Sequence, residues 1–159
     1  MTLEVRPAGH HDLLALVALN GVVQSLHAKL DATYFKPELD GDAVSALFVA
    51  AIEADDAHVL VADQGSEAVG YVWMEIQHRP ETAFSPSRCR TYVHHLAVRE
   101  DARRSGVASA LMRGVEEISR AAGVDRIVLD VWATNDLAHG YFAAEGFTPL
   151  NVVLSKTLR

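Results

Sequence analysis

Hydrophobic side chains recur every three or four positions in four stretches of this chain, which is the spacing of an α-helix with one buried face. The predicted helices cover residues 12–30, 42–54, 106–122 and 135–145. Aspartate or asparagine can cap the second and the fourth of them, and a glycine follows the third and the fourth as a helix stop. The pattern therefore predicts four helices, of which the third carries its charged residues on one face.

Short runs rich in Val, Ile, Leu and aromatic residues separate these helices and predict β-strands. The predicted strands cover residues 3–6, 59–62, 69–77, 91–98, 127–132 and 147–157. A turn cluster at 63–67 joins two of them into a hairpin. The order β-α-α-β-β-β-α-β-α-β predicts one mixed α/β domain spanning residues 1–159.

Composition narrows the class of protein. The 159 residues are 50% hydrophobic and 22% charged, which excludes a disordered or collagenous chain. The net charge of −7 argues against a nucleic-acid surface. A single cysteine, Cys89, rules out an internal disulfide and favours a reducing compartment. The apolar run at 13–19 lacks the flanks of a signal peptide, so we expect a soluble cytoplasmic protein without a membrane partner.

One loop has the chemistry of a phosphate site. The strand that ends at Val98 leads through Arg99 into a helix whose first turn has unpaired N–H groups and a partial positive charge. Small residues there let an anion come close to those groups, and arginines add local positive charge. The P-loop and G-x-G-x-x-G patterns are both missing. The segment indicates a pyrophosphate site, although an ordinary strand-to-helix connection with solvated arginines has the same pattern.

Four short motifs make the chain resemble a known family. They are Leu96-Ala97-Val98, Arg103-x-x-Gly106-x-Ala108, Asn135-x-x-Ala138 and Gly146-Phe147. In this order and at these separations they resemble the GNAT superfamily of acyl-coenzyme A N-acyltransferases. The resemblance implies a single-domain α/β fold with a central, mostly antiparallel sheet, about four flanking helices and splayed strands that hold the cofactor.

The resemblance also implies a place for acetyl-coenzyme A, with no metal. Its pyrophosphate is expected on backbone N–H groups of one loop and the helix start, which comprise Arg103, Arg104, Ser105, Gly106, Val107 and Ala108, with Ser109 nearby. The pantetheine arm is expected beside Leu96, Ala97 and Val98. Asn135 and Ala138 at the next helix start are expected to meet its thioester end, with Phe142 as an apolar wall. The implied reaction is acetyl transfer to a primary amine by direct attack in a ternary complex.

The chain departs from the family at one catalytic position. The family often has a tyrosine there as general acid for the leaving thiolate, whereas this sequence has Phe142, with Tyr141 one residue earlier. One residue turns a helical side chain by about 100°, so Tyr141 inherits the role only if the helix shifts. Two alternatives stay open: a non-catalytic acyl-coenzyme A-binding or regulatory domain, and an unrelated α/β domain for another phosphate ligand.

A base for the attacking amine is expected on the strand beside the thioester. His94 and His95 lie there, and strand alternation predicts that they face opposite sides, with His94 on the side of Tyr92, Leu96 and Val98. In the arylalkylamine branch of the family a catalytic histidine stands four residues before the final valine, which is the position of His94. We therefore expect His94 as the base, with His95 as the second candidate.

The residues that bind the acceptor are predicted from where members of the family often bind it. Candidate acceptor-binding residues are Tyr34, Phe35, Trp73 and Glu75, and Glu75 suits a cationic amine or a proton relay. Trp132 is expected in the core. The expected partner is a small-molecule or peptide amine, and a homodimer is a further expectation because dimers are common in the family.

Overall fold

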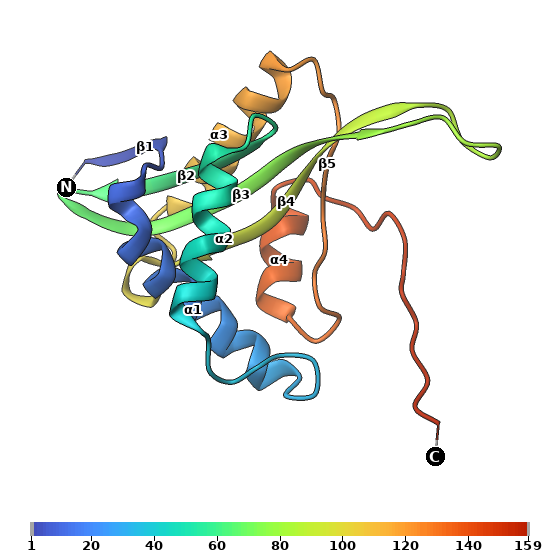
Figure 1. Cartoon of the computed structure of the whole chain (residues 1–159). Helices are drawn as coiled ribbons and strands as arrows, with labels where there is room; N and C mark the ends of the chain where they lie inside the picture. The colour runs from blue at the N-terminus through green and yellow to red at the C-terminus, as the bar shows by residue number, and fades with distance from the viewer. Residues whose placement is uncertain (1, 159) are drawn as a thin grey trace.

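A five-stranded sheet forms the centre of the computed structural model, which describes residues 2–158 (Figure 1). The strands are β1 (Leu3–Pro7), β2 (Ala57–Gln64), β3 (Glu67–Arg79), β4 (Arg88–Val98) and β5 (Ile127–Leu129), and they neighbour each other in chain order. The first four are antiparallel, and β5 runs parallel to β4. The sheet is therefore mostly antiparallel, as predicted.

Helices cover both faces of the sheet. They are α1 (Leu13–Leu30), α2 (Gly41–Glu53), α3 (Val107–Ala121) and α4 (Asp136–Ala144). Leu16 and Phe48, from α1 and α2, belong to a buried cluster with Tyr71 of β3, whereas Leu111 and Val115 of α3 belong to a second cluster on the other face. The predicted mixed α/β fold with four helices is confirmed.

The segment His10–Leu30, which includes α1, is long and apolar enough to cross a membrane by length and composition alone. Core helices of soluble proteins meet the same criterion. In this structure Leu16 and Leu19 of the segment are buried in the cluster that α1 and α2 share with the sheet.

Two strand predictions are wrong in their extent. The predicted strand at 127–132 contains only Ile127–Leu129, and the predicted strand at 147–157 has no strand pairing at all. This last segment runs away from the body of the protein in an open conformation (Figure 1). A strand exists only where a neighbour satisfies its backbone groups, and the described part of this chain provides none for the tail.

The sheet opens between β4 and β5. The two strands pair only over three positions, from Thr91 opposite Ile127 to Val93 opposite Leu129. Beyond Val93, β4 continues to Val98 beside β3, while the chain after β5 is no longer in strand conformation. Among the described residues, β4 therefore has no strand beside it on the β5 side after Val93, and the expectation that splayed strands hold the cofactor stays a prediction.

Gly70 of β3 sits where β4 and α3 come closest to the strand. A Cβ atom at this position would lie 2.9 Å from the carbonyl oxygen of Ala97 and 3.0 Å from Cγ1 of Val107. The first neighbour is backbone and cannot turn aside, so this glycine lets α3 pack directly on the sheet.

We expect Gly70→Ala to lower the free energy of unfolding by about 1–3 kcal/mol, because the added methyl group overpacks this contact. Gly21→Ala is the matched control, because a Cβ at Gly21 in α1 meets nothing within 4 Å. It should instead stabilise the helix by about 0.5–1 kcal/mol. Urea unfolding of both variants measures the difference, and equal stabilities would contradict the packing argument.

Candidate functional site

A β-bulge at His94 decides which way the functional side chains of β4 point. The register places Trp73 opposite His95 but Met74 opposite Val93, so His94 is an extra residue in β4. Val93 and Leu96 consequently both pack against the cluster under α3, although regular alternation would send them to opposite faces.

The bulge brings the two histidines to the same face. The imidazole of His94 stacks on Trp73 with 4.2 Å between ring centroids, and that of His95 meets the same indole edge-on at 5.1 Å. The expectation that the two rings face opposite sides is wrong, and so is the expected grouping of His94 with Leu96 and Val98. Regular alternation does not hold across an inserted residue.

His94 forms a hydrogen-bonded pair with Glu75. Its Nε2 lies 2.9 Å from Oε2 of Glu75, and the two side chains are 25% and 32% exposed. Hydrogen bonds from Gln77 and then from His94 hold the pKa of Glu75 below its usual range, so the carboxylate is ionised at neutral pH. An ionised carboxylate only accepts, so Nε2 carries the proton and Nδ1 of neutral His94 keeps its lone pair.

Two further residues fix the carboxylate. Gln77 donates to Oε2 of Glu75 over 3.1 Å, and Arg90 in turn donates to Oε1 of Gln77 over 3.0 Å. Arg90 is not among the site residues predicted from the sequence, because its contact depends on the hairpin register that places Gln77 opposite it. Knowing how β3 and β4 pair would have identified Arg90.

His95 lies in a different environment from His94. Its Nδ1 is 3.2 Å from the hydroxyl of Tyr71 and 3.3 Å from Nδ2 of Asn20. Asn20 also donates to the Tyr71 hydroxyl over 2.9 Å, so Tyr71 can donate to His95. Burial, with smaller repulsion from neighbouring histidines, lowers the pKa of His95 to about 4. His95 is thus neutral at pH 7, with its lone pair already engaged.

The expected acceptor-side residues fall into two groups. Trp73 and Glu75 lie around His94, and the indole Nε1 of Trp73 is buried without a hydrogen-bond partner among the described residues. Tyr34 and Phe35, in contrast, contact Trp132 in the segment after β5, with ring centroids 5.1 and 4.9 Å apart. Trp132, which was expected in the core, is only half-buried and is the residue that sequence reasoning missed in this second group.

The loop before α3 has the backbone conformation of an anion cradle. Arg104 and Gly106 have positive φ angles of 58° and 84°. The first backbone hydrogen bond of the helix runs from Ala110 N–H to the Gly106 carbonyl, so the N–H groups of residues 107–109 have no carbonyl within the helix. A Cβ placed on Gly106 would meet nothing within 4 Å, so the space above the loop is open.

Arg103 connects this loop to the open edge of β4. Its Nε donates to the carbonyl oxygen of Val98 over 3.3 Å, and its side chain is exposed. Ser105 instead fixes the loop from within, because its hydroxyl donates to the carbonyl of Ala102 over 2.6 Å. Open N–H groups, a glycine with positive φ and nearby arginines fit a pyrophosphate group.

At the start of α4, Asn135 caps the helix, because its side-chain oxygen accepts from the N–H of Ala138 over 3.2 Å. Phe142 packs edge-on against Tyr141 and Phe147. Ser109 of α3 donates to Glu145 at the end of α4 over 2.6 Å, which ties the two helices together.

The hydroxyl of Tyr141 is buried and has no hydrogen-bond partner among the described residues. Its ring packs against the cluster under α3, and burial raises the pKa of the phenol. His94 stacks on Trp73, which packs against the cluster on the other face of the sheet. The role of Tyr141 as general acid stays a prediction.

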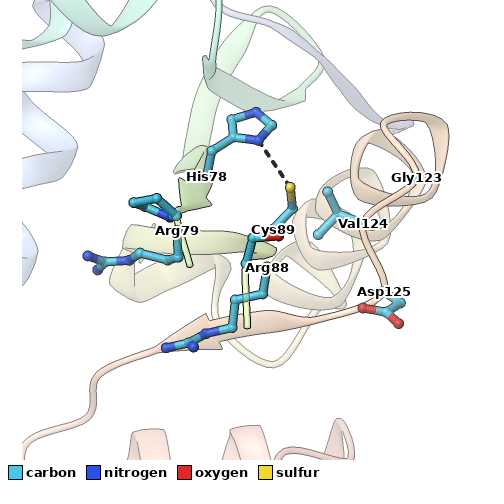
Figure 2. A pocket seen from close by; sticks show the side chains of 9 residues that line it. His78, Arg79, Arg88, Cys89, Gly123, Val124 and Asp125 are labelled. Carbon is cyan, nitrogen blue, oxygen red and sulfur yellow. Dashed lines mark hydrogen bonds between the residues drawn. The ribbon is translucent and has the colours of Figure 1, made fainter. Parts of the chain in front are cut away.

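A cavity of about 580 Å³ lies at the opposite end of β4, between the β3–β4 hairpin and the segment after α3 (Figure 2). His78 and Cys89 line it, with 3.0 Å between Nδ1 and Sγ, and Arg79 and Arg88 lie beside them. None of the predicted site residues lines this cavity. Within residues 2–158 no group of three or more His, Cys, Asp or Glu side chains is arranged to hold a metal ion.

The low pKa of His95 predicts a pH-dependent stability. In the unfolded chain His95 protonates near pH 6.5, whereas in the folded protein it resists protonation until about pH 4. Stability present above pH 6.5 should therefore be lost as the pH falls toward 4, by about 3 kcal/mol at most. Urea unfolding at pH 7 and 4.5 measures the loss, and His95→Gln should reduce it. An imidazole of His95 that titrates near 6.5 by NMR would contradict this assignment.

The sequence comparisons identify a family and a relative of this chain. The model of the acetyltransferase (GNAT) family matches residues 23–147. A protein of Bacillus subtilis (strain 168) named "uncharacterized N-acetyltransferase YycN" is 27% identical over 94 residues. That match covers 58% of this chain and 55% of the relative, so it spans only about half the length of either protein.

Solved structures share the fold over nearly the whole chain. The tetramutant of the BH1408 protein from Bacillus halodurans superposes with a TM-score of 0.90 at 23% identity, covering 98% of this chain and 99% of the other. AAC(6')-Iy in complex with the bisubstrate analog CoA-S-monomethyl-acetylneamine superposes with a TM-score of 0.80 at 19% identity, covering 100% and 99%. With the family match over residues 23–147, the prediction from the sequence motifs is confirmed, and the chain belongs to the GNAT family of acetyltransferases.

Proposed function

We propose that this protein transfers an acetyl group from acetyl-coenzyme A to a primary amine of an acceptor, by direct attack within a ternary complex. The observation that carries the proposal is the solvent-accessible His94–Glu75 pair at the bulge of β4, beside the edge that β5 leaves open. Membership of an acetyltransferase family supports the type of reaction.

The chain's own backbone supports a place for the coenzyme. The N–H of Arg99 donates to the carbonyl of Val69 in β3, so by alternation the backbone groups of Val98 and Leu96 point away from β3, toward the open edge. These groups can bind the amides of a pantetheine arm and, at its end, polarise a thioester carbonyl. Residues 103–109 hold the pyrophosphate, and Asn135, Ala138 and Phe142 of the α4 region border the arm.

His94 acts as the general base in this proposal. Acetyl-coenzyme A supplies an activated acyl group, and the amine must lose a proton to attack its carbonyl carbon. Nδ1 of His94 accepts that proton, while Glu75 orients the ring and stabilises the imidazolium. The new C–N bond replaces the C–S bond, and the departing thiolate takes a proton from water or from Tyr141.

The acceptor in this proposal is a cationic small-molecule or peptide amine. The ionised Glu75 favours a positive charge near His94. Tyr34, Phe35 and Trp132 provide aromatic surface for its apolar part. The net charge of −7 favours a cationic acceptor over a nucleic acid. A cytoplasmic location without a membrane partner stays a prediction.

A non-catalytic acyl-coenzyme A-binding domain is the second candidate, because position 142 is Phe and the Tyr141 hydroxyl is buried. A panel of amines, assayed with acetyl-coenzyme A for release of free thiol, separates the two functions. Acetylation of at least one amine supports the enzyme, and tight coenzyme binding without turnover of any amine supports the binding domain.

We expect Gly106→Val to weaken coenzyme A binding at least tenfold by calorimetry, because a side chain there strains the loop and occupies the open space above it. Gly123→Val is the matched control. Gly123 also has a positive φ, 71° against 84°, and open space around it, but it lies at the other end of α3. The control should bind as the unmodified protein does, and unchanged affinity in Gly106→Val would rule out the cradle.

We expect His94→Ala to lower kcat/KM by about 100-fold or more, most strongly at acidic to neutral pH, where the acceptor amine is protonated. Glu75→Gln keeps the shape of the pair but removes the charge of the carboxylate. We therefore expect it to lower kcat/KM by less than His94→Ala does. His78→Ala, in the exposed hairpin, is the control and should retain full activity. If the pH profile of kcat/KM in His94→Ala equals that of the unmodified protein, His94 is not the base.

A further inference from the structure

The hairpin formed by β3 and β4 extends beyond the body of the protein and carries a cluster of positive charge (Figure 1). Among the described residues, β2 and β5 pair with the sheet only up to the base of this hairpin, so residues 77–90 have no third strand beside them. Arg79, Arg88 and Arg90 lie in this segment, and we call them the hairpin arginines. They concentrate positive charge at one place in a chain whose net charge is −7.

The hairpin arginines share one face of the sheet. Arg79 lies directly opposite Arg88, and Arg90 stands two residues further along β4, so strand alternation directs the three side chains to the same side. The guanidinium groups of Arg79 and Arg88 lie on the side away from His78 and Cys89 (Figure 2). The arginine face is thus separate from the pair formed by these two residues.

A cavity of about 350 Å³ lies against the hairpin arginines, and all three line it. Within residues 2–158 the arginines in ion pairs are Arg6, Arg99 and Arg120, so the hairpin arginines have no carboxylate partner there. Like charges directly opposite each other on paired strands destabilise a hairpin. An anion in the cavity would replace this repulsion by charge-assisted hydrogen bonds. The cavity therefore suits a carboxylate or a phosphate.

The arginine face continues into the candidate site. Glu75, Gln77 and Arg79 alternate along β3, so they lie on the same face as each other. Arg90 donates to Gln77, Gln77 donates to Glu75, and Glu75 is paired with His94. Besides the hydrogen bonds from Gln77 and His94, the charge of Arg79 helps to hold the pKa of Glu75 low. The candidate base and the cavity therefore lie at two ends of one surface.

The length of this surface limits which molecules can use both ends. Four residues of β3 separate Glu75 from Arg79, which corresponds to about 14 Å along the strand. An extended peptide of four residues covers about the same length. A molecule whose amine lies at His94 can therefore place a group four residues away in the cavity.

We propose that the hairpin arginines bind an anionic group of the acceptor, so that the protein selects amines that also carry a carboxylate or a phosphate about 14 Å away. This inference rests on the proposed acetyl transfer, and it names the class of acceptor. The carboxylate of Glu75 attracts the protonated amine, and the hairpin arginines attract the anion at the other end. The acceptor accordingly has one positive and one negative end.

Three tetrapeptides with amidated C-termini test the proposal. They are Ala-Ala-Ala-Asp, the same peptide with phosphoserine in place of Asp, and the neutral Ala-Ala-Ala-Asn. Calorimetry in the presence of coenzyme A gives their dissociation constants without acetyl transfer, and release of thiol from acetyl-coenzyme A gives kcat/KM. We expect an acidic peptide to bind about tenfold more tightly than the neutral one, with kcat/KM higher by a similar factor. The ratio between the two acidic peptides shows which anion the cavity prefers.

The double substitution Arg79→Gln with Arg88→Gln should reduce this preference to less than about twofold, because it removes the two opposed charges. The neutral peptide should bind and react as with the unmodified protein, which shows that the variant is folded. Arg113→Gln with Arg120→Gln is the matched control. It removes two exposed arginines from α3, which packs on the other face of the sheet, and should keep the full preference.

Equal or undetectable binding of the three peptides would overturn the anion site, and so would a preference that survives the change of Arg79 and Arg88. Acetylation of all three peptides with equal kcat/KM would also overturn the anion site, while it supports the proposed acetyl transfer. A preference for the acidic peptides without acetylation of any of them would support the anion site and speak against the transfer. The two proposals can therefore fail separately.

Discussion

The extra residue in β4 at His94 is the constraint on which the rest of the candidate site depends. A regular strand would place His94 and His95 on opposite faces and would continue Val93 and Leu96 in alternation. With the bulge, both imidazoles meet Trp73, and the side chains on either side of the insertion still pack under α3. Bulges bend and twist a strand locally, and β4 separates from β5 at this point. One inserted residue thus accompanies both the change of face and the opening of the sheet.

The two adjacent histidines show how strongly the surroundings determine chemistry. His94 is partly exposed and paired with a carboxylate, whereas His95 is held among Asn20 and Tyr71, where burial lowers its pKa to about 4. The first environment leaves the imidazole accessible from solvent, which the proposed role as base requires. The second favours a ring that is neutral at pH 7 and connects α1 to the sheet through the hydrogen bond with Asn20. Neighbours in sequence therefore have separate roles, one in the candidate chemistry and one in the packing beneath it.

Much of the fold follows from local signals in the sequence. Asn135 caps α4 as predicted, Gly106 adopts the positive φ that begins α3, and Asp40 caps α2 two residues before the predicted start at residue 42, so those helices start close to where the sequence places them. The position of the loop before α3 could be predicted for the same reason. The bulge could not, because a period of two assumes regular pairing on both sides of every residue. The packing of Trp132 against Tyr34 depends on contacts across more than ninety residues, and the predicted strand at 147–157 finds no neighbour among the described residues.

The hydrogen bond from Arg103 to the Val98 carbonyl has a consequence for how the two ends of the candidate site communicate. The guanidinium holds a neutral carbonyl at 3.3 Å, a long and weak contact, within a loop that is suited to anions. A phosphate oxygen would compete for this donor with a stronger, charge-assisted bond. If the loop binds a phosphate as proposed, this arginine would release the carbonyl of Val98 at the edge of β4, and filling one end of the candidate site would free the backbone at the other.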